Sequence, residues 1–422
     1  MNAEILSIGD ELLIGQVTNT NAAYLGEQLS LLGITVRRVT TVGDRLDDLL
    51  QAFTRAWDEQ EIIITTGGLG PTHDDVTRDA VCRFFDTDLV EDAAVCDDVE
   101  RFLAERRRPM TPAHRDQAMV PRSAVVIRNT EGTAPGYHFS RDGRQFFVTP
   151  GVPYEMHAMM ENYILDQLRE GFRSARASLT VLTTGIPEST LSELLVGIET
   201  LCPGCSVAYL PSPTGVRVRL TAVASSQDEA EKRITELQDF LLERAREYVF
   251  GADRDTLEAV VETLLVERGL RLAVAESCTG GLITDRLTDV PGSSRCFDRG
   301  FIAYSNASKT ELLGVDPAII EAHGAVSRET AEAMAAGARR AAAVDVAVST
   351  TGIAGPDGGS TVKPVGLVWI GISSGDGTHA FPHYFGGGRT RTKRRAAQAT
   401  LDLLRRSLLG LPLHPSTSGS IP

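Results

Sequence analysis

Short apolar segments alternate with amphipathic stretches from Ala3 to about Leu168. Short apolar runs are typical of buried strands, and amphipathic stretches are typical of helices that cover a sheet. The pattern predicts strands at residues 3–8, 35–42, 61–66 and 145–149, and helices at residues 21–32, 45–59, 75–85, 92–105 and 153–168. Such alternation predicts a mostly parallel sheet with helices on both faces.

The pattern changes over residues 177–250. We expect a strand at 179–184, a helix at 188–199, strands at 206–210 and 216–224, and a long charged helix from 227 to about 248. The proline- and glycine-containing segment 211–215 is a turn signal between the two middle strands. These elements predict a small α+β module.

Alternation returns over residues 255–409, with strands expected at 271–275, 296–304, 344–350 and 365–373. The predicted fold class is therefore α/β, with two α/β domains of mostly parallel sheet joined by the α+β module. We expect domains at 1–172, 177–251 and 255–410, followed by a flexible Pro/Ser-rich tail at 411–422.

Composition narrows the class of protein. No apolar run approaches the roughly 20 residues of a membrane helix, and the start of the chain resembles a first strand rather than a leader, so we expect a soluble cytoplasmic protein. A net charge of −14 disfavours binding to long nucleic acid. Cys202 and Cys205 form a lone CxxC, which we interpret as a tight turn rather than a metal or redox pair.

The segment 275–281, AESCTGG, follows an expected strand and precedes an expected helix. Unsatisfied backbone N–H groups at such a junction can hold an oxyanion or a phosphate, and Gly280 and Gly281 allow a ligand to approach them. Ser277 would lie beside this site. The alternative is that the segment only begins a helix.

Three further segments are expected near Ser277: 304–309 (YSNASK), 349–359 (STTGIAGPDGG) and the basic run 389–395. The first two follow strands, and ligands of open α/β sheets bind at the carboxyl ends of strands. A serine nucleophile needs a base, and Lys309 could serve if burial or a neighbouring cation such as Arg391 favours its neutral form. Tyr304 could relay a proton, while Thr351 and the Gly352 amide could hold a substrate oxygen. Taken singly, Tyr304 could instead be a core residue, Lys309 a surface lysine and the basic run a solvated helix face.

A second group of polar residues follows the expected strands of the first domain. Asp10 and Glu11 come after the first strand, and the segment 65–77 (TTGGLGPTHDDVT) follows another. Glycine-rich loops present amides to phosphate, and carboxylates bind hard cations. The combination suggests metal-assisted phosphate chemistry, although Asp10, Asp74 and Asp75 could each be only a cap. The dinucleotide-binding GxGxxG pattern is missing after the first strand, which disfavours redox chemistry.

The segments AESCTGG, YSNASK, HGAVS (323–327), TGIAGPDGGS and KPVG (363–366) closely resemble the CinA family (competence/damage-inducible protein A). The resemblance implies an amidase, without a cofactor, that converts nicotinamide mononucleotide to nicotinic acid mononucleotide and ammonia. It implies Ser277 as nucleophile, Lys309 as base, Tyr304 as a supporting hydroxyl, Thr351 as a substrate contact and Arg391 as a phosphate or catalytic contact. The expected substrate-binding residues beside them are Thr279, Gly280, Gly281, Asn306 and Gly352.

The first domain resembles the molybdopterin-binding-like domain of the same family, through SIGDELLIG, NTN (19–21), GGLGPTHDD and TPGVPYEM. This resemblance implies hydrolysis of ADP-ribose to AMP and ribose 5-phosphate with a divalent metal, Mg, Mn or Co. We assign the metal or its water to Asp10, Glu11, Asp74 and Asp75. The diphosphate is assigned to Gly67, Gly68, Gly70 and Thr72.

The middle module is similar to the family's KH-like domain, but it lacks the GxxG loop of RNA-binding KH modules, so we expect a spacer or dimerisation element. The leading hypothesis is a bifunctional, homodimeric hydrolase of pyridine-nucleotide salvage. Two alternatives remain. One is a deamidase whose first domain only binds a nucleotide or pterin, and the other is an accessory factor for competence or DNA uptake.

Overall fold

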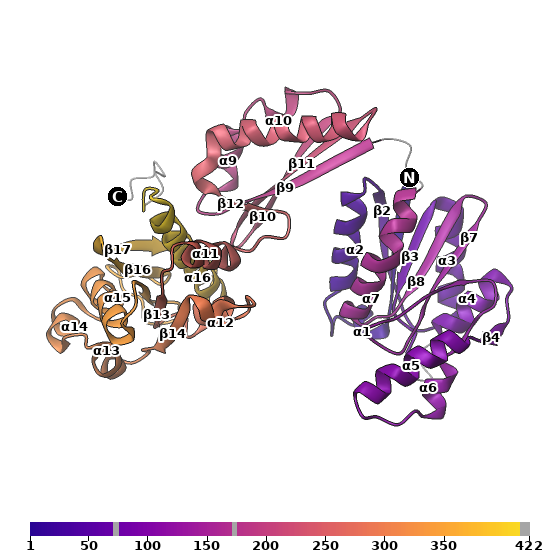
Figure 1. Cartoon of the computed structure of the whole chain (residues 1–422), viewed down its shortest axis with the longest axis horizontal. Coiled ribbons are helices and arrows are strands. Elements are labelled where there is room, and N and C mark those ends of the chain that lie inside the picture. The colour runs from indigo at the N-terminus through magenta and orange to yellow at the C-terminus, as the bar shows by residue number, and fades with distance from the viewer. Residues whose placement is uncertain (71–75, 171–174, 414–422) are drawn as a thin grey trace. The chain divides into compact units, whose positions relative to one another are not determined.

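The computed structural model describes residues 1–70, 76–170 and 175–413. The chain divides into two compact units, Met1–Ser174 and Ala175–Pro422 (Figure 1). The second unit contains both the small α+β module and the C-terminal α/β domain. Within the described ranges, no helix is long and apolar enough to cross a membrane.

The first unit is built on one mixed sheet with strand order β2-β1-β3-β8-β7-β6. Its parallel strands are β2 (Thr35–Val42), β1 (Asn2–Ile8), β3 (Ile62–Thr66) and β8 (Arg144–Thr149). These are the four strands that the sequence predicts. The antiparallel edge strands β7 (Gly136–Arg141) and β6 (Val125–Ile127), and the separate pair β4 (Leu89–Glu91) and β5 (Met119–Pro121), were not predicted.

Helices cover both faces of this sheet because its central strands are apolar on both sides. In β1, Leu6 and Ile8 pack into one core, whereas Ala3 and Ile5 pack into the other. The first core is covered by α3 (Leu46–Glu59), α4 (Thr77–Phe85) and α5 (Ala93–Glu105). The second is covered by α2 (Thr20–Leu31), α7 (Pro153–Met159), η1 (Met160–Ile164) and α8 (Leu165–Glu170). The short helices α1 (Asp10–Leu13) and α6 (Pro112–Asp116) complete the unit.

The α+β module is an antiparallel sheet, order β10-β11-β9-β12, with α10 lying along one face (Figure 1). Its strands are β9 (Ala175–Thr183), β10 (Cys205–Ser212), β11 (Gly215–Ala224) and β12 (Val249–Ala252). Its helices are α9 (Glu188–Leu194), η2 (Ile198–Thr200), α10 (Gln227–Ala245) and η3 (Arg246–Tyr248). Cys202 and Cys205 form a disulfide. Only a tight turn was expected at this CxxC, and the bond was not predicted from the sequence.

The C-terminal domain has strand order β14-β13-β15-β16-β17. Strands β14 (Phe297–Ile302), β13 (Leu272–Glu276) and β15 (Val346–Gly352) are parallel to one another. Strand β16 (Leu367–Ser374) pairs antiparallel with β15, and β17 (Gly377–Tyr384) pairs antiparallel with β16. One face packs on α11 (Leu257–Glu267), α12 (Leu282–Thr288) and α16 (Arg389–Leu409). The other packs on α13 (Asn306–Leu313) and α15 (Arg328–Ala342), with α14 (Pro317–His323) beside them and η4 (Ser293–Arg295) before β14. The predicted fold class of two α/β domains and a small α+β module is confirmed.

Candidate functional site

The carboxyl ends of the three parallel strands β13, β14 and β15 bring Ser277 and Lys309 together. Ser277 directly follows β13, and Lys309 extends from α13, which begins after β14. The Lys309 Nζ atom lies 3.0 Å from Ser277 Oγ. The side chain of Lys309 is 1% exposed, and burial lowers the pKa of its amine. The proximity expected from the sequence is therefore found.

The Lys309 amine has two further partners, and both are backbone carbonyls. It donates to Ala303 O at 3.0 Å and to Tyr304 O at 3.3 Å. Ser305 caps α13 by accepting from the Ser308 amide, which fixes the start of the helix that carries Lys309. The amine is thus held in place by three oxygen atoms.

Glu276 determines the shape of the loop that follows Ser277. One carboxylate oxygen accepts from the amides of Gly281 and Ile283, and the other accepts from the amide and hydroxyl of Thr284. The Gly281 N–H is therefore already bonded and is not a donor for substrate, so the expected role of Gly281 rests on its lack of a side chain. The amides of Thr279 and Gly280 are among those of this loop with no partner in the described residues, so both are available as donors.

The threonines near the site make contacts within the protein. The Thr279 hydroxyl lies 2.8 Å from the Thr350 hydroxyl, and the Thr351 hydroxyl donates to Ala325 O at 2.6 Å. The Thr351 hydroxyl proton is therefore committed, and a substrate could only donate to it. Gly352 ends β15 opposite Val368, and Asn306 is the first residue of α13.

Arg389 contacts Tyr304, whereas Arg391 was the residue of this basic run expected as the phosphate or catalytic contact. The Arg389 guanidinium donates to the Tyr304 hydroxyl at 2.9 Å and to Gly355 O at 3.1 Å. One turn later on α16, Lys393 places Nζ close to Gly280, 3.7 Å from where a Cβ would lie. Arg391 lies on another face of the helix and lines a different cavity. The signal in the sequence that could have identified Arg389 and Lys393 is their four-residue spacing, which places both on one face of the helix.

Cys278, directly beside Ser277, carries a thiol that is a second potential nucleophile in this loop. Its side chain is buried, and burial raises the pKa of the thiol to about 12. A thiol with so high a pKa holds almost no thiolate near neutral pH. The serine is therefore the reactive group that this loop presents beside an amine.

In the first unit, Asp10 is joined to Asp44, which sequence reasoning missed. The Asp10 amide donates to Asp44 Oδ2 at 3.0 Å, and the Asp44 amide donates to Asp10 Oδ1 at 3.3 Å. Asp10 follows β1 and Asp44 follows β2. Because these adjacent strands are parallel, both carboxylates lie at the same edge of the sheet. Glu11 is exposed and its carboxylate folds back over Gly9.

The glycines that follow β3 pack tightly against their surroundings. A Cβ at Gly67 would collide with Ile8 O, and one at Gly68 would collide with the Thr77 hydroxyl. The Gly67 amide donates to Thr149 O at 3.1 Å, so its assignment as a diphosphate donor is wrong. Gly70 is exposed, whereas Thr72, Asp74 and Asp75 lie outside the described residues.

Comparison with known proteins places these sites in a family. Three family models match the chain: a probable molybdopterin binding domain at residues 4–170, the damage-inducible protein CinA KH domain at 178–251 and the CinA C-terminal domain at 254–408. A putative competence-damage inducible protein of Caldicellulosiruptor saccharolyticus is 41% identical over 97% of this chain and 100% of its own length. The chain belongs to the CinA family.

A second relative matches nearly the whole chain, and a solved structure matches about a third of it. A CinA-like protein of Salinibacter ruber is 43% identical over 97% of this chain and 100% of its own length. Among solved structures, a competence/damage inducible protein from Agrobacterium tumefaciens is 42% identical, covers 36% of this chain and 93% of its own, and has a TM-score of 0.35.

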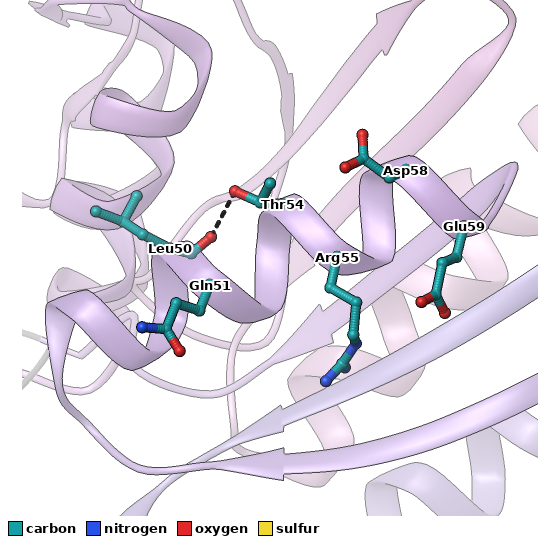
Figure 2. Close-up of a pocket in the computed structure, with 6 residues that line it drawn as sticks. All are labelled: Leu50, Gln51, Thr54, Arg55, Asp58 and Glu59. Atoms are coloured by element: carbon teal, nitrogen blue, oxygen red, sulfur yellow. Dashed lines mark hydrogen bonds between the residues drawn. The ribbon is translucent and has the colours of Figure 1, made fainter.

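The described part of the first domain lacks a complete metal site. Within residues 1–70 and 76–170, no group of three or more acidic, histidine or cysteine side chains is placed to hold a metal ion. Asp10, Asp44 and Glu11 alone do not form one. A shallow cavity of about 530 Å³ lies instead along α3, where its lining residues belong to one exposed helix face (Figure 2). These residues are Leu50, Gln51, Thr54, Arg55, Asp58 and Glu59.

Proposed function

We propose that the C-terminal domain of this CinA protein hydrolyses the carboxamide of nicotinamide mononucleotide, with Ser277 as nucleophile and Lys309 as its base. The observation that carries the proposal is the 3.0 Å separation of Lys309 Nζ and Ser277 Oγ. Nicotinamide mononucleotide as substrate comes from the resemblance to the CinA family. The reaction type is thus inferred from the Ser277–Lys309 contact, and the identity of the substrate is inferred from the family.

The partners of the Lys309 amine favour a base over an acid in the resting enzyme. A neutral amine has two N–H groups and one lone pair, and carbonyl oxygens can only accept. If Ala303 O and Tyr304 O take the two N–H groups, the lone pair faces the Ser277 hydroxyl. Burial lowers the pKa of Lys309 and so increases the fraction of this neutral form.

The reaction then proceeds in two halves. Ser277 Oγ attacks the amide carbon while its proton moves to Lys309 Nζ, and the resulting oxyanion accepts from the free amides of Thr279 and Gly280. Lys309 returns the proton to the leaving nitrogen, the C–N bond breaks and ammonia departs. Water, deprotonated by Lys309, attacks the acyl–serine ester and releases the carboxylate product and the Ser277 hydroxyl.

The phosphate of the substrate is assigned to Arg389 and Lys393. Both extend from the first turns of α16, four residues apart, and therefore project from one face of the helix. Lys393 Nζ lies beside Gly280, and Arg389 contacts the Tyr304 hydroxyl. Guanidinium and ammonium groups are the usual partners of a phosphate monoester.

Ammonia release from nicotinamide mononucleotide by the purified full chain tests the proposal. We expect turnover by the wild-type protein and by Ser294→Ala, which removes an exposed hydroxyl of η4. Ser277→Ala should reduce kcat by about a thousandfold or more, because it removes the attacking oxygen. Equal ammonia release by Ser277→Ala and Ser294→Ala would contradict the proposal.

For the first domain we propose divalent-metal-dependent hydrolysis of ADP-ribose. The supporting observation is that Asp10 and Asp44 lie together at the ends of two parallel strands, where α/β domains bind ligands. The divalent metal, Mg, Mn or Co, comes from the resemblance to the CinA family, because Asp10 and Asp44 alone do not complete a metal site within the described residues. When bound, it would polarise a phosphate oxygen and activate a water. Asp75→Ala and Asp10→Asn should each abolish AMP formation from ADP-ribose. Retained AMP formation would favour the alternative of a nucleotide- or pterin-binding domain.

A further inference from the structure

A cavity of about 870 Å³ lies inside the second compact unit, where loops of the α+β module meet β17 and α16. Segments 184–188 and 211–216 form one side of it, and residues 382–385 and one face of α16 form the other. Neither Ser277 nor Lys309 lines it. Its volume is within the range of about 300–1,000 Å³ that is typical of small-molecule sites.

Three cationic side chains of α16 line this cavity, and two of them, Arg391 and Arg395, are not held in ion pairs among the described residues. Arg391 and Arg395 are one helical turn apart and line it together, whereas Arg389 and Lys393 project toward the Ser277 site. Arg391 is exposed and has no hydrogen-bond or ion-pair partner in the described part of the chain. Arg395 makes one long hydrogen bond, from Nε to Pro213 O at 3.4 Å. Both guanidinium groups therefore retain donors for an anion.

The charged residues deeper in the cavity are already paired. Asp402 accepts from Arg405 at 2.7 Å and from Arg406 at 3.0 Å, and Arg406 also contacts Glu247 at 3.1 Å. Glu188 at the exposed rim is the remaining acidic group of the lining. The net charge of the lining around Arg391 and Arg395 is therefore positive, although the net charge of the chain is −14.

The remainder of the lining is apolar and hydroxyl-bearing. Prolines contribute at 187, 211, 213 and 382, and Ile186 and Leu403 add aliphatic surface. The rings of His383 and Phe385 stack with centroids 5.6 Å apart at its edge. Ser212 and Thr214 provide hydroxyl groups beside Arg395. This surface fits a planar ring with attached hydroxyl groups.

The two sides of the cavity are held to each other by buried and partly buried hydrogen bonds. Arg405 donates to Val249 O at 3.0 Å and to Glu247 O at 2.7 Å, and Gln398 Nε2 donates to Thr184 Oγ1 at 3.2 Å. These bonds join α16 to β12, η3 and the end of β9, which lie close together in Figure 1. A cavity held in this way needs little rearrangement to accept a ligand.

We propose that this cavity binds a nucleoside monophosphate, with the phosphate between Arg391 and Arg395 and the base against the proline-rich wall. The site is separate from the Ser277 site and stands independently of the proposed amidase activity. One helix, α16, carries cationic residues to both.

Calorimetric titration of the full chain with AMP tests the proposal. Arg391→Ala/Arg395→Ala should weaken AMP binding at least tenfold, because it removes both phosphate donors. Arg394→Ala is the matched control, since Arg394 is exposed, lies on the same helix and does not line the cavity. AMP should also bind more tightly than adenosine or inorganic phosphate alone, because the cavity has both an apolar wall and a cationic face.

Hydrogen exchange locates the bound AMP. We expect AMP to protect amides of segments 211–216 and 382–385 in the wild-type protein and not in the double variant. Unchanged AMP affinity in the double variant, with its wild-type Tm retained, would overturn the proposal. So would AMP binding that is lost in Arg389→Ala instead, because AMP would then occupy the Ser277 site.

Discussion

The Glu276 carboxylate receives both the backbone N–H and the hydroxyl of Thr284, at 2.9 and 2.8 Å. Its other oxygen accepts from the amides of Gly281 and Ile283, and the side chain is fully buried. Glu276 thus satisfies the first amides of α12 in place of a conventional capping residue. The turn between Glu276 and Gly281, which contains Ser277, is fixed at both ends.

Replacing Glu276 with Gln should lower both kcat and stability. A carboxamide places an NH2 group where an oxygen accepts two hydrogen bonds, so donors face donors inside the protein. We expect a loss of about 1–3 kcal/mol in the free energy of unfolding. We also expect a fall in kcat of about tenfold or more, with KM and the pH profile little changed, because Glu276 acts by positioning Ser277.

Kinetics and thermal unfolding of Glu276→Gln measure both effects. Asp285→Asn is the matched control, because Asp285 is an exposed carboxylate on α12. Wild-type kcat in Glu276→Gln would show that the loop holds its shape without the carboxylate.

The pH dependence of kcat should report Lys309. The amine must be neutral to accept the Ser277 proton, and burial lowers its pKa from the usual value of about 10.5. Activity should therefore rise with pH and reach its plateau below pH 10.5. A pH–rate profile of ammonia release measures this rise. A rise centred on the ordinary lysine pKa would mean that the amine is not desolvated during catalysis.

Arg389→Gln should weaken substrate binding more than it slows the chemistry. The variant removes a positive charge assigned to the phosphate and the donor to the Tyr304 hydroxyl. We expect KM to rise about 10- to 100-fold, as for loss of a charged hydrogen-bond partner, with kcat changed less. Steady-state kinetics of Arg389→Gln beside Arg394→Gln measure the difference. Equal KM values in the two variants would remove Arg389 from the phosphate site.

Glu262 should make the stability of the C-terminal domain depend on pH. It is buried on α11, and desolvation raises the pKa of its carboxyl to about 7, despite Arg295 nearby. Because the folded-state pKa is the higher one, the stabilising contribution of the protonated form is complete below about pH 4.5 and is lost as the pH rises through 7.

Glu262→Gln should remove this loss. At pH 8 the variant should be more stable than wild type by about 3 kcal/mol, because no buried charge forms. At pH 4.5 the difference should disappear. Thermal unfolding at the two pH values measures it, with the exposed Glu267→Gln as control. A variant less stable than wild type at pH 8 would contradict the assigned pKa.

Apolar periodicity identified the central strands because they are buried on both faces. Residues 3–8 are mostly apolar and residues 62–64 are three consecutive isoleucines, and the structure has strands there. The edge strand β17 escaped prediction because its segment, 377–384, contains two histidines and a proline and is only partly buried. Its pairing with β16 depends on tertiary contact rather than on local pattern.

The juxtaposition of Ser277 and Lys309 followed from placing both after parallel strands. Hydrogen-bond partners did not follow, because they depend on side-chain rotamers that a pattern does not specify. The sequence pattern did not show that the Glu276 carboxylate accepts from the Gly281 amide. Arg391 was also chosen from a run of cations as the phosphate or catalytic contact, whereas Arg389 is the residue of that run that donates to Tyr304.

The most direct test of the account is kcat for ammonia release from nicotinamide mononucleotide by Lys309→Met. Methionine keeps the length and apolar body of the buried side chain but removes the amine that lies 3.0 Å from Ser277 Oγ. With folding verified by an unchanged Tm, the account predicts a fall in kcat of about a thousandfold or more, while Lys232→Arg, an exposed control, retains wild-type activity. Wild-type kcat in Lys309→Met would contradict it.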